Sequence, residues 1–168
     1  MSSYRIGKGA ENTTIAAMDA ETSQLLKQLI SKERTAHLGT LRGGAPMVSM
    51  TLYLPEKDLS AFYVHVSSLA WHTQDLKQDG RVALSIGETD DRRPDPFTLM
   101  RVTIRGEATQ MISGPKDAWL ARFPEQAINF TLADFSFWQI TPRDARFVAG
   151  FGRIHNISAA ELRRIIPA

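Results

Sequence analysis

The sequence predicts a mainly β protein whose strands form an antiparallel barrel, closed or split, with helices at its periphery. Apolar and polar residues alternate with period 2 along much of the chain after residue 34, and short turns rich in Gly, Pro and Asp separate several of the alternating segments. The regular strand–helix–strand units of a parallel sheet are missing, which disfavours a doubly wound fold. An antiparallel sheet with inserted helices accounts for both observations.

Length and composition set further limits. The chain has 168 residues, which favours one domain, and 43% of them are apolar, enough for a core of its own. It has no cysteine, which excludes disulfide frameworks, thiol catalysis and iron–sulfur clusters. The four histidines lack metal-binding spacing, so we expect no metal site. The 20 Lys+Arg and 18 Asp+Glu nearly balance, so we expect no nucleic-acid partner.

The N-terminal part divides into an arm and a helix. Residues 1–18 are polar and aperiodic, so we expect a flexible arm, followed by a single domain over residues 19–168. Asp19 is the expected N-cap of a helix over residues 20–33, which has one apolar side. The chain starts without an uninterrupted apolar stretch and no window approaches 18 apolar residues, so we expect a cytoplasmic protein that does not cross a membrane.

Three consecutive strands are expected next, in an antiparallel meander. Gly43-Gly44 can supply the positive-φ positions of the first hairpin turn. In the middle strand Val48 and Met50 share one face, and Ser49 and Thr51 share the other. The polar face suits the edge of a bound group, or it is simply the wetter side of a barrel strand. The three strands are expected at residues 35–42, 45–54 and 60–66.

The second half of the chain continues the sheet between short helices. A helix over residues 70–78 interrupts the strands, and Gly106 in the middle of a long strand predicts a bulge. Residues 113–115 open another helix, and Pro124 starts a second helical stretch. The capping-box sequence at residues 158–161 predicts a terminal helix. The remaining strands are expected at residues 81–87, 98–112, 133–141 and 145–151, which makes six or seven strands in all.

One segment, residues 65–76, carries recognisable chemistry. It follows a strand, begins with the hydroxyls of Ser67 and Ser68, and continues through His72 and Thr73 into a short helix. Hydroxyls, backbone N–H groups and a helix N-terminus at the end of a strand form an anion site, for which the imidazole is an optional cation. Alternatively, a serine merely caps the helix and His72 lies on the surface. The residues leave both interpretations open.

Three longer segments resemble the pyridoxamine 5′-phosphate oxidase-like, FMN-binding split-barrel superfamily. They are HLGTLRGGAPMVSMTLY (37–53), AFYVHVSSLAWHTQDLKQDGRVALSI (61–86) and FWQITPRDARFVAGFGR (137–153). Within the superfamily, the SSLAWHT and ARFVAGFG elements are most similar to the HugZ-type haem-utilisation branch. The resemblance implies a six-stranded antiparallel split β-barrel with peripheral helices. It also implies a homodimer with two FMN sites at the subunit interface.

The resemblance also implies which residues would bind FMN. The phosphate would be held by the anion-site segment, the ribityl chain and isoalloxazine ring would lie along the second strand, and a C-terminal aromatic side chain would approach from the partner subunit. In this sequence these residues are Ser67, Ser68, His72 and Thr73, with Leu69 contributing backbone contacts, then Val48, Ser49 and Met50, and finally Trp138. No catalytic acid or base is singled out, because a flavin carries the redox chemistry itself.

Two departures from the family pattern shape the expected function. Pyridoxamine phosphate oxidases carry Arg-Leu-His soon after Phe-Trp-Gln, whereas here Arg153-Ile154-His155 begins fifteen residues after Trp138. We therefore do not expect pyridoxamine phosphate as the substrate. HugZ-type proteins often carry a further C-terminal module, and this chain ends at Ala168. The expected function is an FMN-binding oxidoreductase acting on an unknown small molecule. The alternatives are a haem-binding or haem-degrading HugZ-type protein and a non-enzymatic flavin-binding module.

Overall fold

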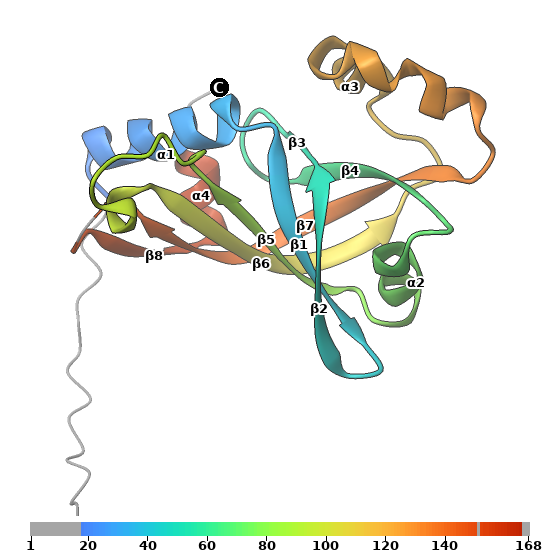
Figure 1. Cartoon of the computed structure of the whole chain (residues 1–168), viewed down its shortest axis with the longest axis horizontal. Helices are drawn as coiled ribbons and strands as arrows, with labels where there is room; N and C mark the ends of the chain where they lie inside the picture. Colours follow the sequence, from blue (N-terminus) through green and yellow to red (C-terminus); the bar gives the residue numbers. More distant parts are fainter. Residues whose placement is uncertain (1–17, 151, 166–168) are drawn as a thin grey trace, which may run out of the picture.

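One curved antiparallel sheet forms the centre of the protein, and helices lie at its ends and edges (Figure 1). The structure, a computed structural model, describes residues 18–150 and 152–165. Within these residues the strand order is β2-β1-β5-β6-β7-β4-β3, and β8 pairs with β7. The strands are β1 (Thr35–Arg42), β2 (Ala45–Leu52), β3 (Leu54–Pro55), β4 (Phe62–Ser67), β5 (Arg81–Gly87), β6 (Arg101–Gln110), β7 (Phe135–Val148) and β8 (Ile154–Ser158). The α-helices are α1 (Ala20–Lys32), α2 (Trp71–Gln78), α3 (Lys116–Arg122) and α4 (Ala159–Arg164), and the 3₁₀ segments are η1 (Pro96–Thr98) and η2 (Pro124–Thr131).

The split-barrel fold predicted from the sequence is confirmed, but the expected number of six strands is wrong. Eight strands form within the described residues, including the two-residue β3 and the unpredicted β8. The two strands expected at residues 133–141 and 145–151 are one strand, β7. Pro142 lies within β7 opposite Gly106, where the register with β6 shifts. Because a bulge tolerates a residue without an N–H, the strand passes through the proline, and the bulge predicted at Gly106 is confirmed.

The main core lies between the inner face of the sheet and helices α1 and α4. Helix α1 contributes Leu26, Leu29 and Ile30, all buried, and it begins at the expected N-cap, where the Asp19 carboxylate accepts the N–H of Thr22 at 2.7 Å. The arm expected over residues 1–18 lies outside the described residues except for Met18, which packs against this core.

A second, smaller core attaches the α3–η2 segment, which Figure 1 shows apart from the other helices. Trp119 and Phe123 pack against Phe137 of β7. Arg122 extends from the same segment to the end of α1, where it donates to the carbonyl oxygen of Glu33 at 2.6 Å. The segment is therefore attached to the barrel by aromatic packing and by a charged hydrogen bond. No helix in residues 18–150 and 152–165 is long and apolar enough to cross a membrane.

Candidate functional site

The predicted phosphate-binding residues lie between the end of β4 and the first turn of α2, and this segment is held by Asp134, the residue that precedes β7. The Ser67 hydroxyl donates to the carboxylate of Asp134 and accepts the N–H of Leu69 at 3.1 Å. The N–H of Ser68 donates to the carbonyl oxygen of Asp134 at 2.7 Å. The Ser67 hydroxyl proton is thus engaged by a carboxylate, while the backbone of the turn is fixed where α2 begins.

Helix α2 begins without a side-chain cap. Its N-cap is Ala70, whose extended backbone leads into the first turn at Trp71. The alternative interpretation, in which Ser67 or Ser68 caps the helix, is therefore wrong. The first N–H groups of a helix lack intrahelical acceptors and carry the positive end of the helix dipole, so this end of α2 is suited to an anion.

His72 and Thr73 are turned inward rather than toward solvent. The Nδ1 atom of His72 lies 3.2 Å from the hydroxyl oxygen of Ser49 on β2. Its Nε2 atom and the Thr73 hydroxyl oxygen are both enclosed without a hydrogen-bond partner in the described part of the chain. Burial lowers the pKa of His72, and the nearby Asp75 carboxylate opposes this effect. The alternative interpretation, in which His72 lies on the surface, is wrong because its Nε2 atom is enclosed. Buried polar atoms without partners are rare in native proteins.

A buried carboxylate that the sequence reasoning did not single out fixes α2 on the sheet. Asp75 is 3% exposed, and its side chain accepts the Thr40 hydroxyl at 2.9 Å. Arg42, at the end of β1, pairs with the same carboxylate at 3.0 Å and lies 4.3 Å above the ring of Trp71. The available sequence signal was an acidic residue beside Thr73 on the buried side of a short helix. These contacts hold the start of α2 in a defined place.

The predicted residues of β2 are divided between the two faces of the sheet. Ser49 faces α2, whereas Val48 and Met50 on the other face are 64% and 66% exposed. Beside them the small residues Gly39 and Ala83 leave a shallow groove of about 410 Å³. The guanidinium-bearing side chains that line this groove are Arg81, Arg105 and Arg143. The apolar face of β2, which the alternation alone would place in a core, is therefore solvent-exposed in the single chain.

Trp138 is separated from the other predicted cofactor residues. It lies opposite Val64 of β4, belongs to the main core and is 3% exposed. Its ring N–H is enclosed without a partner among the described residues. Its approach to a flavin bound by a partner subunit stays a prediction. In this structure Trp138 is a core residue.

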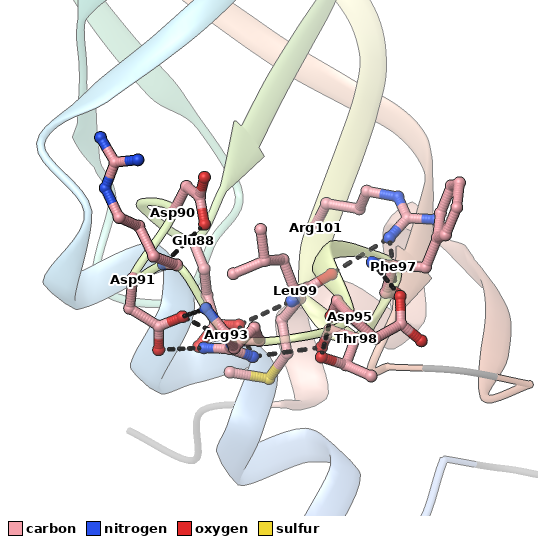
Figure 2. Close-up of polar contacts among 11 residues, drawn as sticks. Glu88, Asp90, Asp91, Arg93, Asp95, Phe97, Thr98, Leu99 and Arg101 are labelled. Atoms are coloured by element: carbon pink, nitrogen blue, oxygen red, sulfur yellow. Dashed lines mark hydrogen bonds and ion pairs between the residues drawn. The ribbon is translucent and has the colours of Figure 1, made fainter.

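The polar loop between β5 and β6 forms a second cluster of charges, drawn in Figure 2. Arg93 pairs with Asp91 at 2.8 Å and with Glu88 at 3.3 Å, and Glu88 also accepts the N–H of Met100 at 2.7 Å. The charges of the cluster are therefore largely satisfied within the loop and stabilise it. Across residues 18–150 and 152–165, no group of three His, Cys, Asp or Glu side chains is placed to bind a metal ion.

Comparisons with known proteins agree with this fold. The chain is 34% identical over 111 residues to the non-canonical heme oxygenase HOZ, chloroplastic, of Arabidopsis thaliana; the match spans 64% of this chain and 33% of that protein. The structure of a heme binding protein from Mycobacterium smegmatis matches 87% of this chain and 60% of its own, with a TM-score of 0.76 and 24% identity. HutZ, the heme storage protein from Vibrio cholerae, matches 76% of this chain and 91% of its own, with a TM-score of 0.63 and 20% identity.

The match to a family model is more direct evidence of family membership than these similarities. The chain spans about a third of the plant relative, and the two solved structures are similar at a level of identity that shows a shared fold. The model described as pyridoxamine 5′-phosphate oxidase matches residues 22–149, which include the whole sheet except β8. The haem-related names among the relatives agree with the HugZ-type branch expected from the sequence. The chain therefore belongs to the pyridoxamine 5′-phosphate oxidase family.

Proposed function

We propose that the protein is an FMN-binding flavoprotein that works as a homodimer and acts as an oxidoreductase on a small molecule. The observation that carries this proposal is the start of α2, where an uncapped helix end lies beside two enclosed polar atoms without partners, on His72 and Thr73. A phosphate monoester supplies several strong hydrogen-bond acceptors and a negative charge, which is what these groups lack.

The residues that would hold FMN follow from this placement. The N–H groups at the start of α2, the Ser68 segment and Thr73 would hold the phosphate, and Ser49 with its His72 partner would border the cofactor along β2. Ser67 would not bind the phosphate through its hydroxyl, because this group is bound to Asp134. It would contribute by holding the segment that precedes α2 in place. When bound, FMN supplies the redox chemistry, and the protein positions the cofactor and adjusts its environment.

The proposed dimer is supported by apolar side chains that the single chain leaves in solvent. Val48 and Met50 on β2, and Leu69 and Trp71 beside the start of α2, are each more than half exposed. Val48 and Met50 point away from α2, but β2 is an edge strand of the sheet, and an edge strand with exposed apolar side chains is a typical interaction surface. A second copy at this edge would also adjoin Ser49 and the start of α2, and it would enclose a cofactor there. Val48→Asp should therefore yield a monomer in sedimentation velocity and weaken FMN binding, whereas Ile128→Asp, an exposed apolar residue on η2, should do neither.

The direct test compares FMN with riboflavin. Protein purified from cells should carry a flavin absorption spectrum, and mass spectrometry of the released compound should identify FMN. Thr73→Val should lower FMN affinity and leave riboflavin affinity unchanged, because the variant removes only the proposed phosphate contact. Thr35→Val, which removes an exposed hydroxyl from β1, is the matched control. Colourless protein whose melting temperature FMN does not raise would refute the proposal.

Haem binding is the second candidate, and the observation in its favour is the haem-related names of several relatives. Three histidines would be tested as axial ligands: His37 is exposed on the outer face of β1, and His65 and His155 are partly buried. Adding hemin should produce a shifted Soret band that one of the three alanine variants abolishes. A haem spectrum that none of the three variants changes would exclude these histidines as axial ligands. Turnover assays with FMN bound then separate an enzyme from a flavin-binding module.

A further inference from the structure

A half-open cavity lies between the α3–η2 segment and the adjoining strands, away from the start of α2. Its volume is about 300 Å³, which is the lower end of the range for small-molecule sites. Its aromatic lining consists of Phe130, Phe135 and Phe137 together with His65 of β4, whose ring contacts all three. The cavity therefore lies where the inserted helices meet the barrel.

The imidazole of His65 packs directly against the three phenyl rings. The imidazole is parallel to the ring of Phe130, with centroids 4.3 Å apart and planes inclined by 12°. Phe137 follows at 4.5 Å and Phe135 at 5.4 Å, both tilted. Burial lowers the pKa of His65, so the imidazole is neutral near pH 7 and the walls carry no charge. Its Nδ1 atom is enclosed without a partner in the described residues, so the cluster is not a fully satisfied packing unit.

One cation stands at the mouth of this cavity. The Nζ atom of Lys116 lies 5.0 Å from the centre of the Phe130 ring. Lys116 takes part in none of the ion pairs that join the described residues. Two hydroxyl-bearing residues, Ser113 and Ser136, complete the polar part of the lining. An unpaired ammonium beside neutral aromatic walls favours a ligand that combines a flat apolar body with an anionic group.

We propose that this cavity binds a small planar aromatic carboxylate, with its ring against the part-exposed rings of Phe130 and Phe135 and its carboxylate paired with Lys116. The volume admits one or two fused rings and excludes a molecule of the size of FMN or haem. The site is separate from the proposed flavin site. It adjoins that site along β4 and β7, where Ser67 pairs with Phe135 and where Asp134 accepts both the Ser67 hydroxyl and the N–H of Ser68.

Binding is tested by NMR, with 2-naphthoate added to isotopically labelled full-length protein. FMN is present in excess so that naphthoate cannot bind in the proposed flavin site. Backbone amide shifts should concentrate at Ser113, Gly114 and Ser136. The neutral analogue 2-naphthamide should bind at least about tenfold more weakly, because it lacks the charge that Lys116 recognises. Lys116→Met should lower the affinity for naphthoate by a similar factor. Lys57→Met, at an exposed lysine in the turn after β3, should not change it.

Two further measurements separate a binding site from simple packing. Phe130→Leu should weaken naphthoate binding while the melting temperature shows that the protein remains folded. Cyclohexanecarboxylate, which has the charge but no flat ring, should bind more weakly than benzoate. Naphthoate and naphthamide of equal affinity, or an unchanged affinity in Lys116→Met, would overturn the proposal. So would the absence of localised shifts at millimolar ligand, since the cavity would then be only a packing defect beside the second core.

Discussion

Replacing Asp75 by alanine should destabilise the protein by about 3 kcal/mol. The variant removes a hydrogen bond from Thr40 to a charged acceptor, which contributes about 1.5–3 kcal/mol. It also removes the ion pair with Arg42, which contributes no more than about 1 kcal/mol because the arginine side chain is 36% exposed. For a domain of this size the loss corresponds to a decrease in melting temperature of about 6–12 °C.

Thermal and urea unfolding, followed by circular dichroism, provide the measurement. Asp75→Asn keeps an oxygen for the Thr40 hydroxyl and loses the ionic contribution, so it should cost about 1 kcal/mol. Asp117→Ala removes an exposed carboxylate from α3 and is the matched control. If Asp75→Ala shifts the midpoint no more than Asp117→Ala, the buried carboxylate does not anchor α2 and the reasoning is refuted. FMN affinity should decrease together with stability, because α2 carries the proposed phosphate site.

Three other perturbations test separate parts of the fold. Gly106→Ala should lower the free energy of unfolding by at least about 2 kcal/mol, since its Cβ would lie 2.2 Å from the carbonyl oxygen of Thr141. Gly87→Ala is the control, because the nearest atom to its Cβ is 3.8 Å away, and equal unfolding midpoints for the two variants would contradict this prediction. The pKa of His65 is lowered in the folded state from its usual 6.5, so the unfolded chain binds more protons than the folded chain as the pH falls. The contribution of His65 to the free energy of unfolding is therefore present above about pH 6.5 and is lost at lower pH. His65→Phe should flatten this dependence in urea titrations between about pH 7 and 5, and an unchanged slope would rule out His65 as its source. Ser158→Ala should lower the free energy of unfolding by about 1 kcal/mol by removing the capping box of α4, and an unchanged melting temperature would show that α4 does not need it.

Sequence reasoning succeeded where a structural signal is local. The glycines of the first hairpin turn do take positive φ, at 58° and 82°, as a two-residue hairpin requires. The bulge at Gly106 and the capping box at Ser158 were also read from a few neighbouring residues. The division of 133–151 into two strands was wrong, because one continuous strand passes through Pro142. Only the partner strand shows that the proline lies at a bulge, where no N–H is needed.

The local structure around the candidate site was predicted better than its tertiary contacts. The sequence correctly indicated a hydroxyl-bearing segment leading from a strand into a short helix, and the family that goes with it. It did not indicate that the Ser67 hydroxyl is bound to Asp134, because these residues are 67 positions apart and no local pattern joins them. The Thr40–Asp75 contact, 35 positions apart, was missed for the same reason.

The amino-acid sequence by itself determined an antiparallel barrel with inserted helices, because alternation, turns and caps are properties of neighbouring residues. That the barrel is split was implied by the resemblance to the family. Alternation also assigned Val48 and Met50 to one face of β2 and Ser49 to the other, but it could not say which face is inside. The tertiary structure decided this: α2 covers Ser49 and leaves the apolar pair in solvent. A strand acquires an inner face only when the sheet curves and a helix packs on it. Which polar atoms are enclosed and which apolar side chains stay exposed therefore depends on contacts between distant segments.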